Sequence, residues 1–374
     1  LRLGRLRWLA GKWWTLMFES GGESQYTSKW DPAADLAKYV PNAQLSRSQF
    51  DVGFYRNILF YIGLQWVRFD ASRQNWSPIN LPQWFPKSNT NKFSVACDGM
   101  KAVLEQARPS IIYSPGSSDE ADIAAVSACE SISSVIDTEV DQERLRSECA
   151  ALITLTGNAF VTDGYDMSGM NGEKSVQSLT CLECKTTAQP HEMEGQCPKC
   201  GGRQLMPAVD EQGSPLNEKY PIGRMDSEVD APFGILFDMQ ALHIDNSPFI
   251  IKAKTYPIDE LKAMFPDYAA GMGDGKPGGK TGLFYQQALS YAVGTMGLSG
   301  SPSAGGGSQG GRGTLYRLMR KPCKELPYGG EALVIDETVV WKGEASTKDD
   351  KGTPFYPITH FGFKKVPGRV FYKT

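Results

Sequence analysis

The sequence predicts an α+β fold in which helices come first and antiparallel strands follow, with a four-cysteine module inserted between them. Apolar residues recur at helical spacing in the first part of the chain, and the period changes to two from residue 158. Two C-x2-C pairs lie between these parts. Because helices and strands occur in separate runs without strict alternation, the pattern is typical of the α+β class.

Two helices are predicted in the first part of the chain. Over residues 48–66, aromatic and aliphatic side chains recur at helical spacing and form one broad apolar face. Ser46 or Ser48 is available as the N-cap of this helix. A second helix is predicted over residues 95–107, and Pro109 ends it because proline disfavours helical geometry at the residue before it.

A long helix with one break is predicted from residue 117 to residue 156. Its first residues, Ser117 to Glu120, have the S-x-x-E form of a capping box. Gly157 is expected to end it, because glycine adopts the left-handed conformation of a helix C-cap at low cost. Apolar residues repeat every three positions along this helix, at Ile123, Val126, Cys129, Ile132 and Val135.

Strands are expected in the second part of the chain, which also contains a short helix with Pro257 in its first turn. The predicted strands are 159–165, 234–238, 315–320 and a hairpin over 332–341 with its turn at Asp336 and Glu337. Residues 271–313 are rich in Gly and Ser, with one helix near 283–296. Because this composition buries little apolar surface, the tract is expected to be the most mobile part of the chain and to lie outside the core.

The four cysteines Cys181, Cys184, Cys197 and Cys200 read C-x2-C, twelve residues, then C-x2-C. Each pair offers two thiolates on a tight turn, and together they provide the tetrahedral all-sulfur set that suits zinc. Glycines directly after the second pair allow the backbone to turn under the metal. The pattern predicts a zinc ribbon whose Zn²⁺ is structural, because four protein ligands leave no open position for water.

Other interpretations of these cysteines remain open. They could form two disulfides, or remain free thiols in a surface loop. His191 lies between the two pairs and could replace one ligand, but it is expected to be a solvated loop residue. The other four cysteines are expected to be small buried hydrophobic residues, and with a zinc ribbon they indicate synthesis in a reducing compartment. They are Cys97, Cys129, Cys149 and Cys323.

Composition excludes some classes of function. Hydrophobic residues make up 41% of the chain and no apolar run is long enough to span a membrane, so no membrane partner is expected. A net charge of −3 argues against a protein whose whole surface binds nucleic acid, although DNA could still pass along it. The chain begins without Met, and we expect it to be a piece of a longer polypeptide.

No catalytic array is evident. Residues 276–281 resemble the end of a phosphate-binding loop, but Asp274 stands where the first glycine is required, and an acid there would repel phosphate. The three histidines form no metal-binding motif, and there is no G-x-S-x-G elbow. We therefore expect a protein that is not an enzyme.

Four stretches, in their order, resemble portal proteins of tailed bacteriophages. FYRNILFYIGLQW at 54–66 is similar to the opening helix of that family, and GNAF at 157–160 to the strand after its long helix. PFGILFD at 232–238, with DNSPFI at 245–250, looks like its central β segment. Residues 356–371 are similar to the approach to its stem helix. The resemblance covers residues 48–374.

The resemblance implies that the chain is a portal wing. The regions are then an arm (1–47), a helical part of the wing (48–165), an inserted zinc-ribbon segment (166–230) and a β-rich part of the wing (231–374), with stem, clip and crown beyond residue 374. Portals form rings, usually dodecamers, at one capsid vertex of the virion. They are made in the host cytoplasm, pass double-stranded DNA, and contact the terminase, the head-tail adaptor and the major capsid protein.

Two features depart from the family: many portals lack the zinc ribbon, and the Gly/Ser tract has no counterpart. The first part of the arm, residues 1–27, is expected to pack on a neighbouring subunit through Trp8, Trp13, Trp14 and Arg7.

The alternative function is a nucleic-acid-processing enzyme that uses the ribbon to bind DNA. However, the three basic residues of the ribbon are balanced by three acidic ones, which favours an adhesive or bracing role.

Overall fold

The computed structural model describes residues 29–374 apart from 71–74, 81, 83, 86–89, 108–110, 167–172, 189–196, 198, 210–216, 269–311, 350, 366–369 and 373–374. The chain divides into two compact units, one of Leu1–Gly164 with Asp226–Thr374 and the other of Tyr165–Met225. Four predicted features lie outside the described residues: the first part of the arm (1–27), His191, the phosphate-loop-like residues 276–281 and the helix 283–296. The described part combines helices with antiparallel sheets, which confirms the α+β class.

The first described helix, α2, spans Pro32–Tyr61 and so begins well before the position predicted for it. The side chain of Asp31 accepts hydrogen bonds from the amides of Ala33 and Ala34, and proline occupies the first turn. Ser46 and Ser48 do not cap the helix: their hydroxyls donate to backbone carbonyls of the preceding turn. The prediction of their role was wrong because serine within a helix can satisfy its hydroxyl in this way.

The next three helices are α3 (Lys92–Gln106), α4 (Glu120–Glu139) and α5 (Gln142–Thr156). The predicted break in the long helix is confirmed between α4 and α5, where Asp141 has a φ of 53°. Gly157 ends α5 with a φ of 73°, as predicted. The capping box is wrong: Asp119 is the N-cap, and the Ser117 hydroxyl accepts only from the Asp119 amide.

The apolar repeat in α4 does not form a buried face, since no residue of α4 is buried. Ile123, Ile132 and Val135 are all more than half exposed. The physical reason is that each residue of an α-helix turns by about 100°, so a repeat every three positions drifts around the helix. The pattern predicted the helix correctly, but it could not provide one continuous stripe for packing.

The main sheet is antiparallel, in the order β10-β11-β12-β13-β14. Its strands are β10 (Ile235–Phe237), β11 (Phe249–Pro257), β12 (Arg312–Arg320), β13 (Gly330–Ile335) and β14 (Thr338–Gly343). The predicted hairpin between β13 and β14 is confirmed, and Asp336 in its turn has a φ of 52°. The strand predicted at 315–320 belongs to β12, which also includes the last residues of the Gly/Ser tract. The predicted helix after Pro257 is α7 (Ile258–Met264).

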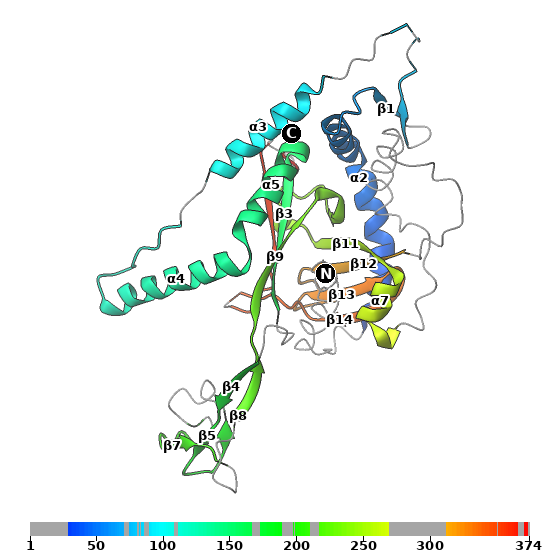
Figure 1. Ribbon diagram of the computed structural model, residues 1–374. Helices are drawn as coiled ribbons and strands as arrows, with labels where there is room; N and C mark the ends of the chain where they lie inside the picture. Colours follow the sequence, from blue (N-terminus) through cyan, green and yellow to red (C-terminus); the bar gives the residue numbers. More distant parts are fainter. Residues whose placement is uncertain are drawn as a thin grey trace. The chain divides into compact units, whose positions relative to one another are not determined.

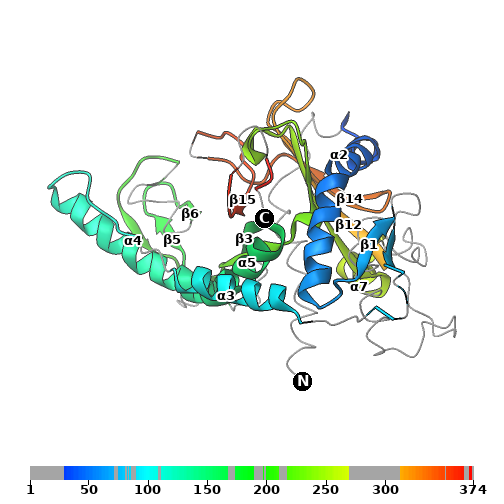
Figure 2. The same cartoon turned by 90° about the horizontal axis from the view of Figure 1, so that it is seen from above.

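Both faces of the main sheet are buried, because alternate residues of each strand point to opposite sides. On one face, Leu315 and Leu333 pack against α7. On the other, Leu318 and Val334 pack against the first half of α2, which lies across the sheet in Figures 1 and 2. The strands therefore read as continuous apolar runs rather than as alternating ones.

A second antiparallel sheet has the order β15-β3-β9, formed by Ile358–Gly362, Asn158–Asp166 and Arg224–Asp230. Lys252 of β11 links the two sheets: it is 2% exposed and its ammonium group pairs with Asp230 of β9 and with Glu228. A small hairpin of β1 (Val67–Asp70) and β2 (Asn75–Pro78) follows α2. The unit Tyr165–Met225 contains β4 (Glu173–Gln177), β5 (Leu179–Cys181), β6 (Thr187–Ala188), β7 (Leu205–Pro207) and β8 (Asn217–Pro221).

His360 of β15 is enclosed by aromatic rings. Its imidazole stacks on Phe160 with 4.4 Å between ring centroids, and its Nε2 lies 3.0 Å from the side-chain oxygen of Asn158. Burial lowers the pKa of His360 to about 4, and the charges of His243 and Lys365 act in the same direction. The neutral imidazole is therefore the form that the folded protein accommodates.

The free energy of unfolding should decrease as the pH falls from 6.5 to 5. In this range His360 takes up a proton in the unfolded chain but stays neutral in the folded chain. The decline contributed by this residue has a limiting slope of about 1.4 kcal/mol per pH unit. Denaturant unfolding across this range measures it. The His360→Gln variant should lose that slope and the His243→Gln variant should retain most of it, since burial of His360, the largest cause of its lowered pKa, remains. Equal slopes in both variants would contradict the assignment.

Candidate metal centre

The four predicted cysteines converge in the unit Tyr165–Met225. The ligand atoms of Cys181, Cys184, Cys197 and Cys200 all lie within 4.8 Å of one another. The Sγ atoms of Cys181 and Cys200 are 3.5 Å apart, and those of Cys184 and Cys197 are 3.4 Å apart. The sequence prediction that these residues belong to one site is thereby confirmed, and the cluster could hold a metal ion.

Short hydrogen-bonded turns position each cysteine pair. Cys181 is the last residue of β5, and its carbonyl accepts from the Lys185 amide at 2.9 Å. In the second turn, the Cys197 carbonyl accepts from the Gly201 amide at 2.8 Å. Lys185 and Gly201 occupy equivalent places in the two turns, with φ of 56° and 72°. The second turn has glycine at the position that requires a left-handed backbone. The first has lysine there, which costs conformational free energy because of its Cβ atom.

The spacing of the sulfurs fits a tetrahedral ion. Four sulfurs placed about 2.3 Å from a central ion lie about 3.8 Å from one another, close to the separations found here. A disulfide would require an S–S distance of about 2.05 Å. All four residues are free cysteines, so the disulfide interpretation does not describe this cluster.

The protein environment perturbs the thiols in opposite directions. Hydrogen bonds with Thr186 lower the pKa of Cys184 to about 6. The Gly202 amide lowers the pKa of Cys200, but hydrogen bonds with the neighbouring thiols outweigh it and raise that pKa to about 12. A metal ion bound by four thiolates must therefore displace protons from the cluster, so its affinity increases with pH.

Burial separates the ligands into an inner and an outer group. Cys181 and Cys197 are buried, Cys184 is partly buried and Cys200 is exposed. The Gly202 amide donates to Cys200 Sγ at 3.4 Å, which stabilises charge on the outer sulfur. The proposed substitute ligand, His191, lies outside the described residues, and the cluster is complete with four cysteines alone.

The other cysteines only partly match expectation. Cys97 is buried, and Cys149 and Cys323 are partly buried. Cys129 is exposed on α4, so the prediction of a buried hydrophobic residue was wrong there. The reason is that α4 buries none of its side chains. Burial raises the pKa of Cys149 to about 11, which makes it a poor nucleophile at neutral pH.

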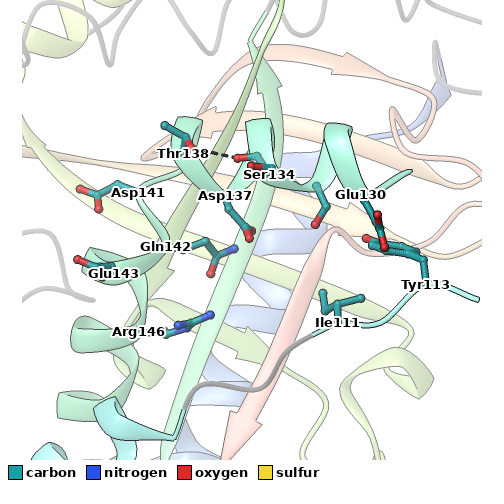
Figure 3. Close-up of a pocket in the computed structure, with 11 residues that line it drawn as sticks. Ile111, Tyr113, Glu130, Ser134, Asp137, Thr138, Asp141, Gln142, Glu143 and Arg146 are labelled. Carbon is teal, nitrogen blue, oxygen red and sulfur yellow. Dashed lines mark hydrogen bonds between the residues drawn. The ribbon is translucent and has the colours of Figure 1, made fainter. Parts of the chain in front are cut away.

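Sequence patterns did not reveal a pocket of about 680 Å³ beside the junction of α4 and α5, shown in Figure 3. Its lining includes the carboxylates of Glu130, Asp137, Asp141 and Glu143, and the guanidinium group of Arg146. The only available signal was charge, because residues 109–143 contain acidic residues and no basic one.

None of the described helices is both long enough and apolar enough to cross a membrane. Comparison of the chain with models of protein families, and with curated proteins, finds no match to either.

Proposed function

We propose that the chain is the wing region of a phage portal subunit, a structural component that forms a ring at one capsid vertex. In this role the ring is the conduit through which double-stranded DNA enters and leaves the virion. The observation that carries the proposal is that the four portal-like stretches of the sequence, although far apart along the chain, contribute to a single hydrophobic core.

This core contains side chains from every one of the four stretches. Phe54, Tyr55 and Leu59 come from α2, and Phe160 comes from β3. The central β segment supplies Phe233, Ile235, Phe237 and Ile250, and the last stretch supplies Ile358 and Phe371. Phe371 lies edge-on to Phe54 with 5.6 Å between ring centroids. Because these segments pack against one another, the portal-like residues act as one structural unit rather than as four independent matches.

The charge of the chain supports a conduit rather than a DNA-gripping surface. Many Lys and Arg side chains would release counterions from DNA and hold it tightly. A chain with a net charge of −3 allows DNA to pass without being bound tightly. The remaining partners follow from the portal proposal: further copies of the chain, in a ring of twelve, the terminase, the head-tail adaptor and the major capsid protein.

For the metal centre we propose a structural Zn²⁺ in a zinc ribbon. Four thiolates form a soft, tetrahedral ligand set, which favours zinc over magnesium or calcium. Full coordination by protein leaves no position for a reacting water. The ribbon carries equal numbers of basic and acidic residues, which favours contact with another protein over contact with DNA.

The proposal is tested by electron microscopy and mass photometry of the full-length protein. Closed rings with a central channel are expected, because heterologous contacts between identical chains close when the rotation per subunit divides the circle. A protein that remains monomeric at concentrations of tens of micromolar would refute it.

The rival function, an enzyme that processes nucleic acid, predicts nucleotide hydrolysis. We expect no ATPase activity in the isolated protein, because Asp274 replaces the glycine that a phosphate-binding loop requires. Phosphate release is the measurement, with Lys280→Ala as the diagnostic variant. Hydrolysis that disappears in Lys280→Ala would favour the enzyme over the portal.

A further inference from the structure

Helix α4 is a long surface helix whose own packing is incomplete. None of its residues is buried, and Ile123 is 54% exposed. Next to it, Ile111 and Ile112 in the extended segment before α4 are 73% and 83% exposed. This part of the chain therefore leaves apolar surface exposed that a further segment could cover.

The pocket beside α4 combines this apolar wall with a strong negative charge. Figure 3 shows Ile111 and Tyr113 on one side, and Glu130 and Asp137 of α4 facing the same space. Asp141 and Glu143 add two more carboxylates at the start of α5, where Arg146 also lines the pocket and Arg144 lies 3.8 Å from Asp141. The carboxylates favour a cationic ligand, and Ile111 and Tyr113 favour one that also presents apolar or aromatic groups.

One segment of this chain has that composition. Residues 1–18, LRLGRLRWLAGKWWTLMF, contain Arg2, Arg5, Arg7 and Lys12 and no acidic residue. Trp8, Trp13 and Trp14 are interspersed among them. Tryptophan and arginine are the residues that most often anchor an interface, because they bury a large area and can still donate hydrogen bonds. In contrast, residues 109–143 contain eight acidic residues and no basic one.

We infer that the pocket beside α4 receives the segment 1–18 of a neighbouring copy of the chain. This rests on the ring under Proposed function, where each copy presents two unlike surfaces and each interface joins one of each kind. The tryptophans pack on Ile111 and Tyr113, while the basic residues pair with Glu130 and Asp137. The contact gives α4 a partner and orients successive copies head to tail.

The test is site-specific photo-cross-linking within the whole chain. Benzoylphenylalanine replaces Trp13, and equal amounts of ¹⁵N-labelled and unlabelled protein are dissociated, mixed and reassembled together before irradiation. Cross-linked peptides are identified by mass spectrometry. Mixed-isotope links from position 13 to residues 111–146 are expected. Same-isotope links alone would show that each arm binds its own chain, and links to other regions would show a different docking site; either result overturns the inference.

Matched charge variants separate docking from general electrostatics. Glu130→Gln with Asp137→Asn should lower the cross-link yield roughly three- to tenfold, the range expected for two exposed ion pairs. Ala121→Lys with Ala128→Lys changes the net charge equally, on exposed positions of α4 turned away from the pocket, and should leave the yield unchanged. Equal losses in both variants would overturn the inference. Circular dichroism verifies that α4 remains helical.

Particle size, measured on the same samples, distinguishes this inference from the ring itself. Rings without links to the pocket would refute arm docking and leave the portal proposal intact. Mixed-isotope links in a sample that forms no ring would support arm docking and refute the ring.

Discussion

The Cys197→Ser variant is expected to lose its metal and to unfold the module around it. One Zn²⁺ per chain is expected in the native protein and none in the variant. Structural zinc contributes about 10–16 kcal/mol of apparent binding energy to small zinc modules. The strands beside the centre have only three, two and three residues, too few to be stable by themselves.

Elemental analysis measures the metal, and hydrogen exchange locates the unfolding. Exchange should accelerate over residues 175–205 and remain unchanged in α2 and the main sheet, which belong to the other unit. Cys129→Ser is the matched control, because it removes an exposed thiol outside the cluster and should retain the metal. A native protein without zinc, or one whose cluster cysteines are disulfide-bonded in solution, would refute the proposed centre.

Replacing Arg47 with methionine is expected to cost about 3–5 kcal/mol of unfolding free energy. Arg47 is only 5% exposed, and its guanidinium group donates to the carbonyls of Pro232, Phe233 and Ile235 at 2.7–3.1 Å. It also pairs with Asp51, 2.9 Å away. Methionine fills similar space but removes the donor that three carbonyls and a carboxylate share.

The unfolding transition in denaturant, followed by near-ultraviolet circular dichroism, measures this cost. Arg56→Met is the control on the same helix, because Arg56 is exposed and its loss should change stability by less than about 0.5 kcal/mol. If the two variants are equally stable, the contacts of Arg47 contribute nothing measurable to holding α2 against the start of β10.

Arg47 also shows what local sequence patterns miss. The residue lies outside the predicted helix 48–66, and a lone arginine is normally expected at the surface. The three carbonyls that accept its hydrogen bonds are more than 180 residues away along the chain. Only the tertiary fold brings them together, so no spacing rule could have identified the contact. The early start of α2 has a local cause, because the Asp31-Pro32 start signal lies outside the apolar repeat of residues 48–66.

Features set by near neighbours were predicted well. The end of α5 at Gly157, the turn at Asp336 and the cluster of four cysteines follow from local chemistry: left-handed φ, tight turns and paired thiols. The errors arose where a side chain had a choice of partners. Ser46, Ser48 and Ser117 satisfy their hydrogen bonds without capping a helix, and Cys129 is exposed because nothing in the described chain covers α4.

The sequence by itself determined the α+β class and the four-cysteine cluster, because periodicity and cysteine spacing act over a few residues. The tertiary structure decided which surfaces are buried. It placed four distant stretches in one core, enclosed His360 between aromatic rings and left α4 with acidic and apolar side chains exposed. Burial depends on contacts between residues remote in sequence, and these contacts exist only once the chain has folded.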